Sequence, residues 1–182
     1  MKFYNVIFLE GVRRIGKSSQ CVLLRQLLGS KRTVGQINLD QKLSTSDLMD
    51  KVNEIRQWCT ENPEGTLLVN GSLAYSIAYK DLANQKYGSS YDEFELPIKN
   101  FNNLLREFKT ISLLLQATDY EYLESRYSID EVHNKVEVKM LYDGFEFFAQ
   151  HSQVSNFKWV KVPITKYDSI LQIHAKMLKQ LQ

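Results

Sequence analysis

Residues 11–18 read Gly-Val-Arg-Arg-Ile-Gly-Lys-Ser and match the pattern G-x-x-x-x-G-K-S. In this pattern the glycines let the backbone curl, so that successive N–H groups point at the phosphates of a nucleoside triphosphate. Lys17 would reach the β- and γ-phosphates, and the Ser18 hydroxyl would be a ligand of Mg²⁺. The motif therefore predicts a phosphate-binding loop (P-loop) with ATP and Mg²⁺ as cofactors.

The segments on either side of the loop are those that a P-loop needs. An apolar run at residues 6–9 precedes it, and residues 21–28 have the spacing of a helix that begins at Ser18. The start of that helix would add its positive dipole end to the phosphate site. A chance match that binds nothing is the alternative, and the unbroken order of strand, loop and helix argues against it.

The rest of the chain alternates short apolar runs with longer stretches of helical spacing. The apolar runs lie at residues 3–9, 33–37, 66–69, 111–116 and 157–162. Helices are expected to begin at Ser18, near Ser46, with Ser46 and Asp47 as capping residues, and near Leu73, Asp92, Asp130 and Tyr167. Five strands joined by helical crossovers predict an α/β fold with a five-stranded parallel sheet flanked by helices.

A parallel sheet of this kind binds its ligand beyond the carboxyl ends of its strands. The informative residues should therefore follow the strands, at residues 11–19, 38–40, 70–72, 117–119 and 163–165.

Length and charge narrow the classes of protein that fit. The 182 residues suit one domain over residues 1–182, and the net charge of +2 gives no reason to expect a nucleic-acid polymer or a membrane surface as partner. Cys21 and Cys59 lack metal-ligand spacing and are expected to be reduced and buried. The chain has neither an 18-residue apolar run nor a signal peptide, which predicts a soluble, cytoplasmic protein. His133, His151 and His174 share no ligand spacing.

Around the loop, residues 8–21 resemble the opening of thymidylate kinases, especially the eukaryotic and large-virus type, which reads approximately F-E-G-L-D-R-x-G-K-S-T-Q-C. Residues 66–69 and 74–79 resemble the third strand and the following helix of that family. Residues 126–127 resemble its lid segment. The resemblance implies a three-layer P-loop kinase fold with a short lid at about residues 119–134, and it makes a homodimer plausible.

The resemblance also implies roles for individual residues. Arg14 would be a catalytic arginine that holds charge on the transferred phosphoryl group together with Lys17, in line with the need for cations around the phosphoryl oxygens. A solvated loop arginine is the alternative. The residues expected to bind the donor nucleotide are Gly11, Val12, Arg13, Arg14, Ile15, Gly16, Lys17, Ser18 and Ser19. Those expected to bind the acceptor are Arg13, Tyr75, Arg106 and Arg126.

The sequence departs from the family on the acceptor side. Arg13 stands where the family usually has an Asp, and the family's Asp-Arg pair after the third strand falls on uncharged residues within 70–72. Arg32 is a further candidate for the acceptor phosphate, whereas Arg106 could equally be a solvated helix residue. Carboxylates that could orient Mg²⁺ are Glu10, Asp40 and Asp119, although Asp40 could cap a turn and a structural role is favoured for Asp119. Tyr79 and Tyr91 join Tyr75 as candidates for stacking on a base.

Three functions remain open. The first is ATP-dependent phosphoryl transfer to a nucleotide, with an acceptor that differs from thymidylate or with slow turnover. The second is a catalytically degenerate, kinase-like nucleotide-binding protein with a sensor or structural role. A deoxynucleoside kinase ranks third, because it needs a carboxylate after the third strand to deprotonate a hydroxyl.

Overall fold

The computed structural model describes residues 2–12, 14–39, 43–71, 76, 92–126, 139, 142–143 and 159–182. Its five described strands form one parallel sheet in the order β2-β3-β1-β4-β5. The strands are β1 (Val6–Glu10), β2 (Val34–Asn38), β3 (Thr66–Asn70), β4 (Thr110–Ala117) and β5 (Trp159–Ile164). The predicted parallel α/β sheet is therefore confirmed.

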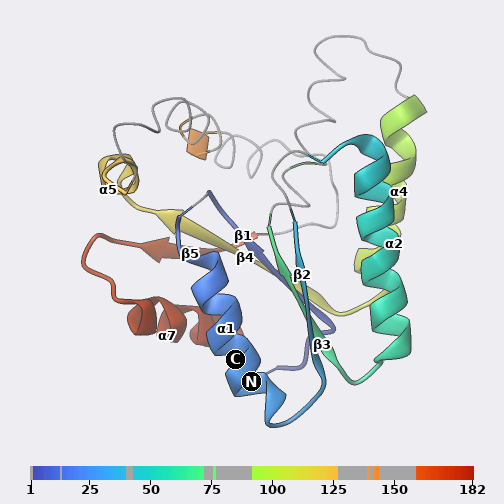
Figure 1. Ribbon diagram of the computed structural model, residues 1–182, viewed down its shortest axis with the longest axis horizontal. Helices are drawn as coiled ribbons and strands as arrows, with labels where there is room; N and C mark the ends of the chain where they lie inside the picture. Colours follow the sequence, from blue (N-terminus) through green and yellow to red (C-terminus); the bar gives the residue numbers. More distant parts are fainter. Residues whose placement is uncertain are drawn as a thin grey trace.

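Helices cover both faces of the sheet and give the fold its three layers (Figure 1). One face carries α1 (Lys17–Gly29) and α7 (Ile170–Gln180), and the other carries α2 (Thr45–Glu61) and α4 (Asp92–Glu107). A short helix, α5 (Tyr120–Glu124), follows β4. No helix among the described residues is both long and apolar enough to span a membrane.

Side chains alternate between the two faces of the sheet along its central strands, so the core consists of two clusters, one on each face. Leu68 packs with Leu24 of α1, whereas its neighbours Leu67 and Val69 pack with Phe101 of α4. Every residue of β1 is buried, as a strand in the middle of a covered parallel sheet requires. Full burial of such a Leu or Phe side chain contributes about 1.5–3 kcal/mol. This packing holds rigid the strand that leads into the loop.

Several boundaries differ from the sequence-based expectations. Ser44, and not Ser46, caps α2: its side chain accepts the backbone N–H of Asp47, whose carboxylate accepts the N–H of Ser44. Ser169 likewise caps α7, which begins three residues after Tyr167 at Ile170. The sequence does not predict α5, since five residues are too few to show a helical period. The helices expected near residues 73 and 130 begin outside the described residues.

The carboxyl ends of the strands meet at one edge of the sheet. The β1–α1 connection, the end of β3 at Asn70 and the end of β4 at Ala117 all lie there, because the strands are parallel and in register. The first turn of α1 also begins at this edge (Figure 1). This arrangement places the predicted loop where an open α/β sheet binds its ligand.

Candidate phosphate-binding site

The loop between β1 and α1 depends on glycine at its two ends. Gly11 has a φ of 131°, and a Cβ on it would lie 2.4 Å from the backbone oxygen of Leu115 in β4. Gly16 has a φ of 103° and immediately precedes α1. Such φ values are readily reached only by glycine. The loop can therefore run close against β4 and turn sharply into the helix.

The start of α1 offers its backbone N–H groups to an anion. Its N-cap is Gly16, so no side chain caps the helix, and its first turn holds no acidic residue. The first N–H groups of a helix have no partner within the helix, and the dipole makes this end positive. Phosphate is the natural ligand of such an end.

Lys17 lies across the mouth of the loop. Its Nζ donates hydrogen bonds to the carbonyl oxygens of Gly11 and Val12, each at 2.7 Å. These bonds hold the ammonium beside the helix start. Phosphate oxygens would compete with the two carbonyls for the same donors, and a charged acceptor forms the stronger hydrogen bond.

Arg14 reaches from the loop to the end of α5. Its Nη1 donates to the carbonyl oxygen of Arg126 at 2.7 Å, and its own backbone has a φ of 60°, in the left-handed region. The guanidinium of Arg126 lies over the ring of Tyr122, 5.5 Å from its centre. The structure thus brings together two arginines that are distant in the sequence.

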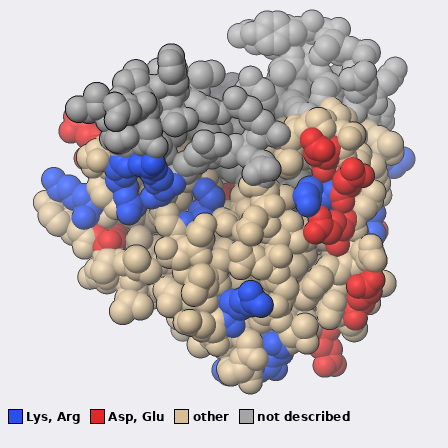
Figure 2. Space-filling view, in the orientation of Figure 1, with Lys and Arg blue, Asp and Glu red and all other residues tan. Residues whose placement is uncertain are grey.

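These groups line one cavity of about 440 Å³. Its lining residues are Arg14, Gly16, Lys17, Ser18, Ser19 and Arg126. Figure 2 shows basic side chains gathered on the surface beside the start of α1. A cavity lined by three cations and a helix N-terminus favours a polyanion such as a triphosphate.

Amide side chains approach Ser18 from the ends of β2 and β3. The Nδ2 of Asn70 donates to Ser18 Oγ at 3.2 Å and to Asn38 Oδ1 at 3.0 Å. The same Asn38 oxygen accepts from Gln36 Nε2 at 2.9 Å. The sequence predicts that residues 38–40 and 70–72 lie near the ligand, but it does not predict these contacts or a part for Gln36, although residues two apart on a strand share one face.

Gln20 joins the loop helix to α7. It is fully buried, its Nε2 donates to the carbonyl oxygen of Ile170 at 2.9 Å, and its Oε1 lies 3.0 Å from Nδ1 of His174. Because Oε1 can only accept, Nδ1 carries the proton. Burial lowers the pKa of His174, which keeps the ring neutral near pH 7. The side chain of His174 therefore serves the packing of α7 against α1.

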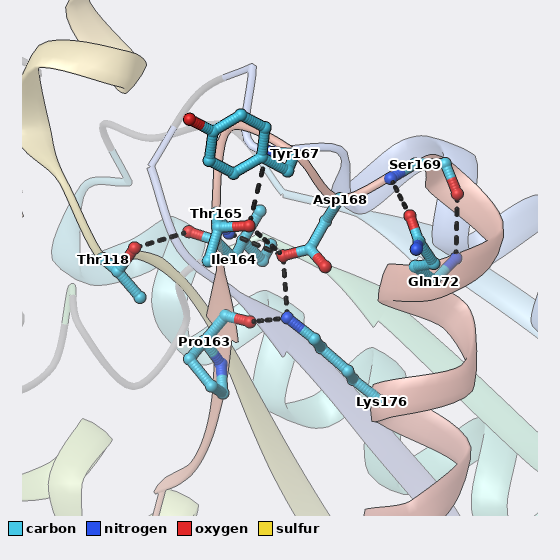
Figure 3. Close-up of polar contacts among 9 residues, drawn as sticks. All are labelled: Thr118, Pro163, Ile164, Thr165, Tyr167, Asp168, Ser169, Gln172 and Lys176. Carbon is cyan, nitrogen blue, oxygen red and sulfur yellow. Dashed lines mark hydrogen bonds and ion pairs between the residues drawn. The ribbon is translucent and has the colours of Figure 1, made fainter.

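The turn between β5 and α7 is built around Asp168 (Figure 3). Its carboxylate accepts from Lys176 Nζ at 2.7 Å, from the backbone N–H of Thr165 at 2.7 Å and from the Thr165 hydroxyl at 2.9 Å. Lys176 also donates to the carbonyl oxygen of Pro163 at 2.9 Å. These hydrogen bonds, chiefly the one from Lys176, lower the pKa of Asp168. The turn presents Tyr167, whose surface is 80% exposed.

Other predicted acceptor ligands lie away from the loop or outside the described residues. Arg106 is exposed in the last turn of α4, just before β4 begins at Thr110, and therefore sits at the opposite edge of the sheet. Arg32 lies at that same edge, with its guanidinium 5.0 Å from the centre of the Phe3 ring. Neither arginine belongs to the site. The residues that fall outside the described ones are Arg13, Asp40, Tyr75, Tyr79 and Tyr91.

The carboxylates near the loop have different surroundings. Glu10 is fully buried at the end of β1. Asp119 caps α5 by accepting the backbone N–H of Glu121 at 2.9 Å, which accounts for it structurally. Within the described residues, no three His, Cys, Asp or Glu side chains cluster as a metal site would require. The hard oxygen ligand suited to Mg²⁺ at the loop is the Ser18 hydroxyl, and Mg²⁺ commonly takes its other ligands from phosphates and water.

Neither cysteine is a nucleophile under ordinary conditions. Burial raises the pKa of Cys21 to about 12, although the charge of Lys17 opposes this, and burial raises the pKa of Cys59 to about 11. Because only the thiolate is reactive, both residues act as buried apolar side chains. The chemistry of the site therefore rests on its cations and backbone dipoles.

Comparison with other proteins identifies the fold. No protein-family model and no curated protein sequence matches this chain. Solved structures match it over nearly its whole length. Thymidylate kinase from Ehrlichia chaffeensis is 18% identical, with a TM-score of 0.56 over 97% of this chain and 98% of that one.

Two further structures show the same similarity. The YorR protein of Bacillus subtilis, in complex with phosphorylated GDP, is 13% identical with a TM-score of 0.61, over 97% of this chain and 95% of that one. Deoxyadenosine kinase from M. mycoides with bound dCTP is 12% identical with a TM-score of 0.53, over 97% and 98%. The chain therefore has the three-layer α/β fold of the P-loop nucleotide kinases, and its predicted resemblance to them is confirmed at the level of the fold.

Proposed function

We propose that this chain transfers the γ-phosphoryl group of ATP to a nucleotide, as a thymidylate kinase-like enzyme of the cytoplasm. The observation that carries the proposal is the cavity in which Lys17, Arg14 and Arg126 surround the uncapped N-terminus of α1. Phosphoryl transfer needs positioning and cations around the moving group rather than covalent chemistry. The loop supplies Lys17 and Arg14 to this cavity, and Arg126 comes from the end of α5.

Each group has a distinct role in this reaction. The backbone N–H groups of residues 12–19 would hold the donor phosphates, and Lys17 would bind their β- and γ-oxygens. Arg14 would stabilise the charge that spreads over the oxygens of the transferred group. Ser18 would hold Mg²⁺, which when bound neutralises charge on the phosphates.

The acceptor side argues for a substrate other than thymidylate. At the end of β3, where the resemblance implies a charged pair, the structure has Asn70 and Gly71. Arg126 lines the cavity. Among the described residues, it is the arginine that remains a candidate for binding the acceptor. Arg13 and Tyr75 stay predictions, as does a homodimer.

A second function is favoured by the same neutral end of β3. With Asn70 rather than a carboxylate beside Ser18, the chain could bind nucleotide without transferring its phosphoryl group and act as a sensor or structural subunit. A deoxynucleoside kinase is less favoured, because the sequence directly after β3, Gly71 and Ser72, has no carboxylate to take a proton from a hydroxyl.

Binding and turnover measured separately distinguish these functions. We expect calorimetry to show ATP binding that Mg²⁺ strengthens, and a panel of nucleoside monophosphates and deoxynucleosides to yield a phosphorylated product. Binding without any product would favour the second function, and no binding would refute both.

Two lysine variants test the loop itself. Lys17→Ala should abolish binding, whereas Lys31→Ala should bind as the unsubstituted protein does, because Lys31 is exposed at the opposite edge of the sheet. Circular dichroism would confirm that both variants fold, since Lys17 also bonds two loop carbonyls.

A further inference from the structure

A chain of three amides runs along the α1 face of the sheet to the P-loop. Gln36 and Asn38 are two apart on β2 and share a face, and Asn38 is the register partner of Asn70 on β3. Leu68, two residues before Asn70, packs in the cluster that contains Leu24 of α1. The three amides therefore lie on the side of the sheet from which Ser18 approaches.

The hydrogen bonds give this chain a direction. Both hydrogens of Asn70 Nδ2 are used, one by Asn38 Oδ1 and one by Ser18 Oγ. A reversed Asn70 amide would set its oxygen against the oxygen of Asn38, which is repulsive. Asn38 is itself oriented by Gln36, whose Nε2 donates to that same oxygen. The orientation of Asn70 thus depends on the two residues of β2.

We propose that Asn38, oriented by Gln36, is a positioning residue for Ser18 and acts through Asn70. An N–H from Asn70 occupies one lone pair of Ser18 Oγ and leaves the other lone pair for a cation among the phosphates. A neutral amide chain thereby sets the direction of the hydroxyl without adding a charge to the site. The inference rests on the proposed function, because it requires the loop to bind a nucleotide with Mg²⁺.

The competing explanation is that these amides merely join β2 to β3. Asn38 and Gln36 are exposed, and exposed neutral hydrogen bonds contribute little to stability. The two explanations predict different effects on metal-dependent binding. A structural role would change the unfolding midpoint and leave the benefit of Mg²⁺ unaltered.

The test uses calorimetry to measure the affinity for ATP, once in the presence of Mg²⁺ and once in EDTA, and compares the two values. The variants are Asn38→Leu, Asn70→Leu and the double variant. We expect Asn38→Leu to weaken Mg²⁺-dependent binding about fivefold, the equivalent of one hydrogen bond, and to leave binding in EDTA unchanged. In the Asn70→Leu background the Asn38 substitution should have no further effect, because the connection is already broken.

Asn5→Leu is the matched control. Its Nδ2 donates to the carbonyl oxygen of Pro63 at 3.0 Å and its Oδ1 accepts from the Lys109 N–H at 3.0 Å, at the opposite edge of the sheet. This variant should lose stability. The ratio of its ATP affinity with Mg²⁺ to its ATP affinity in EDTA should equal that of the unsubstituted protein.

Two results would overturn the inference alone: an unchanged ratio in Asn38→Leu, or a full additive loss in the double variant. If the unsubstituted protein bound no nucleotide, the proposed function would fall, and this inference with it.

Discussion

Arg14 combines a strained backbone with a bond that offsets the strain. Its φ of 60° places a residue with a Cβ in the left-handed region, which costs about 1–2 kcal/mol relative to glycine. Its Nη1 donates to the carbonyl oxygen of Arg126 at 2.7 Å, on the exposed surface, and such a bond contributes about 0.5–1.5 kcal/mol. The two contributions nearly cancel, and a pair of substitutions separates them.

Arg14→Ala removes the hydrogen bond and keeps the strain, so we expect a loss of about 1 kcal/mol in the free energy of unfolding. Arg14→Gly removes both, and its stability should lie within about 0.5 kcal/mol of that of the unsubstituted protein. Glycine should therefore be more stable than alanine here by about 1 kcal/mol. Both variants should lose phosphoryl transfer, because neither carries the guanidinium.

Urea denaturation followed by circular dichroism measures the stabilities, and a coupled assay of nucleotide turnover measures function. Gln26, exposed on α1, is the control position: there alanine should be more stable than glycine by about 1 kcal/mol, because glycine weakens a helix interior. Equal stabilities for Ala and Gly at position 14 would refute the strain argument. Normal turnover in Arg14→Gly would refute the catalytic role.

Three further predictions concern other parts of the fold. Gly11→Ala should lower the free energy of unfolding by about 2–4 kcal/mol, because the new Cβ would meet a carbonyl of β4 and the φ is one that L side chains rarely adopt. Chemical denaturation measures this loss, and an unaltered midpoint would contradict the prediction. Cys21 and Cys59, with pKa values raised by burial to about 12 and 11, should react with a thiol reagent at pH 8 only as fast as the protein unfolds, and rapid labelling of folded protein would show the burial to be wrong. Asp168, whose lowered pKa comes chiefly from its hydrogen bond with Lys176, should contribute stability above pH 3.8, the ordinary value, and lose it as the pH falls through the lower folded pKa. Asp168→Asn should therefore be less stable at pH 7 by about 1–2 kcal/mol and lose less stability on acidification, which thermal unfolding at several pH values would check.

The parts of the fold that depend on residues close together in the sequence can be predicted from the sequence. The P-loop pattern spans eight residues, and the strand that precedes it and the helix that follows it lie where their apolar spacing predicts. The predicted cap of α2 is wrong by two residues, because Ser44 and Ser46 both stand before the first apolar position, and only backbone geometry decides which one accepts the N–H of Asp47. Helix boundaries are the least certain part of such a prediction for this reason.

For Arg106 the sequence leaves two alternatives open, an acceptor ligand and a solvated helix residue, and its position in the fold favours the second. Its residue type suits an acceptor phosphate, and its helix begins at Asp92, as the sequence predicts. A residue that directly precedes a strand of a parallel sheet, however, must lie at the edge where the strands begin, which is the edge away from the P-loop. Topology therefore excludes Arg106, although its residue type alone favours it.

The residues around the cavity differ in how far apart in the sequence the members of each contact lie. The residues proposed to bind the donor form one continuous segment, residues 11–19, so they are recognisable from local sequence alone. Two other contacts at the cavity join Arg14 to Arg126, 112 residues away, and Ser18 to Asn70, 52 residues away. Such pairs are brought together by the strand order β2-β3-β1-β4 and carry no local pattern. Under the proposed function, acceptor preference would depend on such long-range contacts, and substitution of Asn70 should alter it while the affinity for ATP in EDTA stays the same.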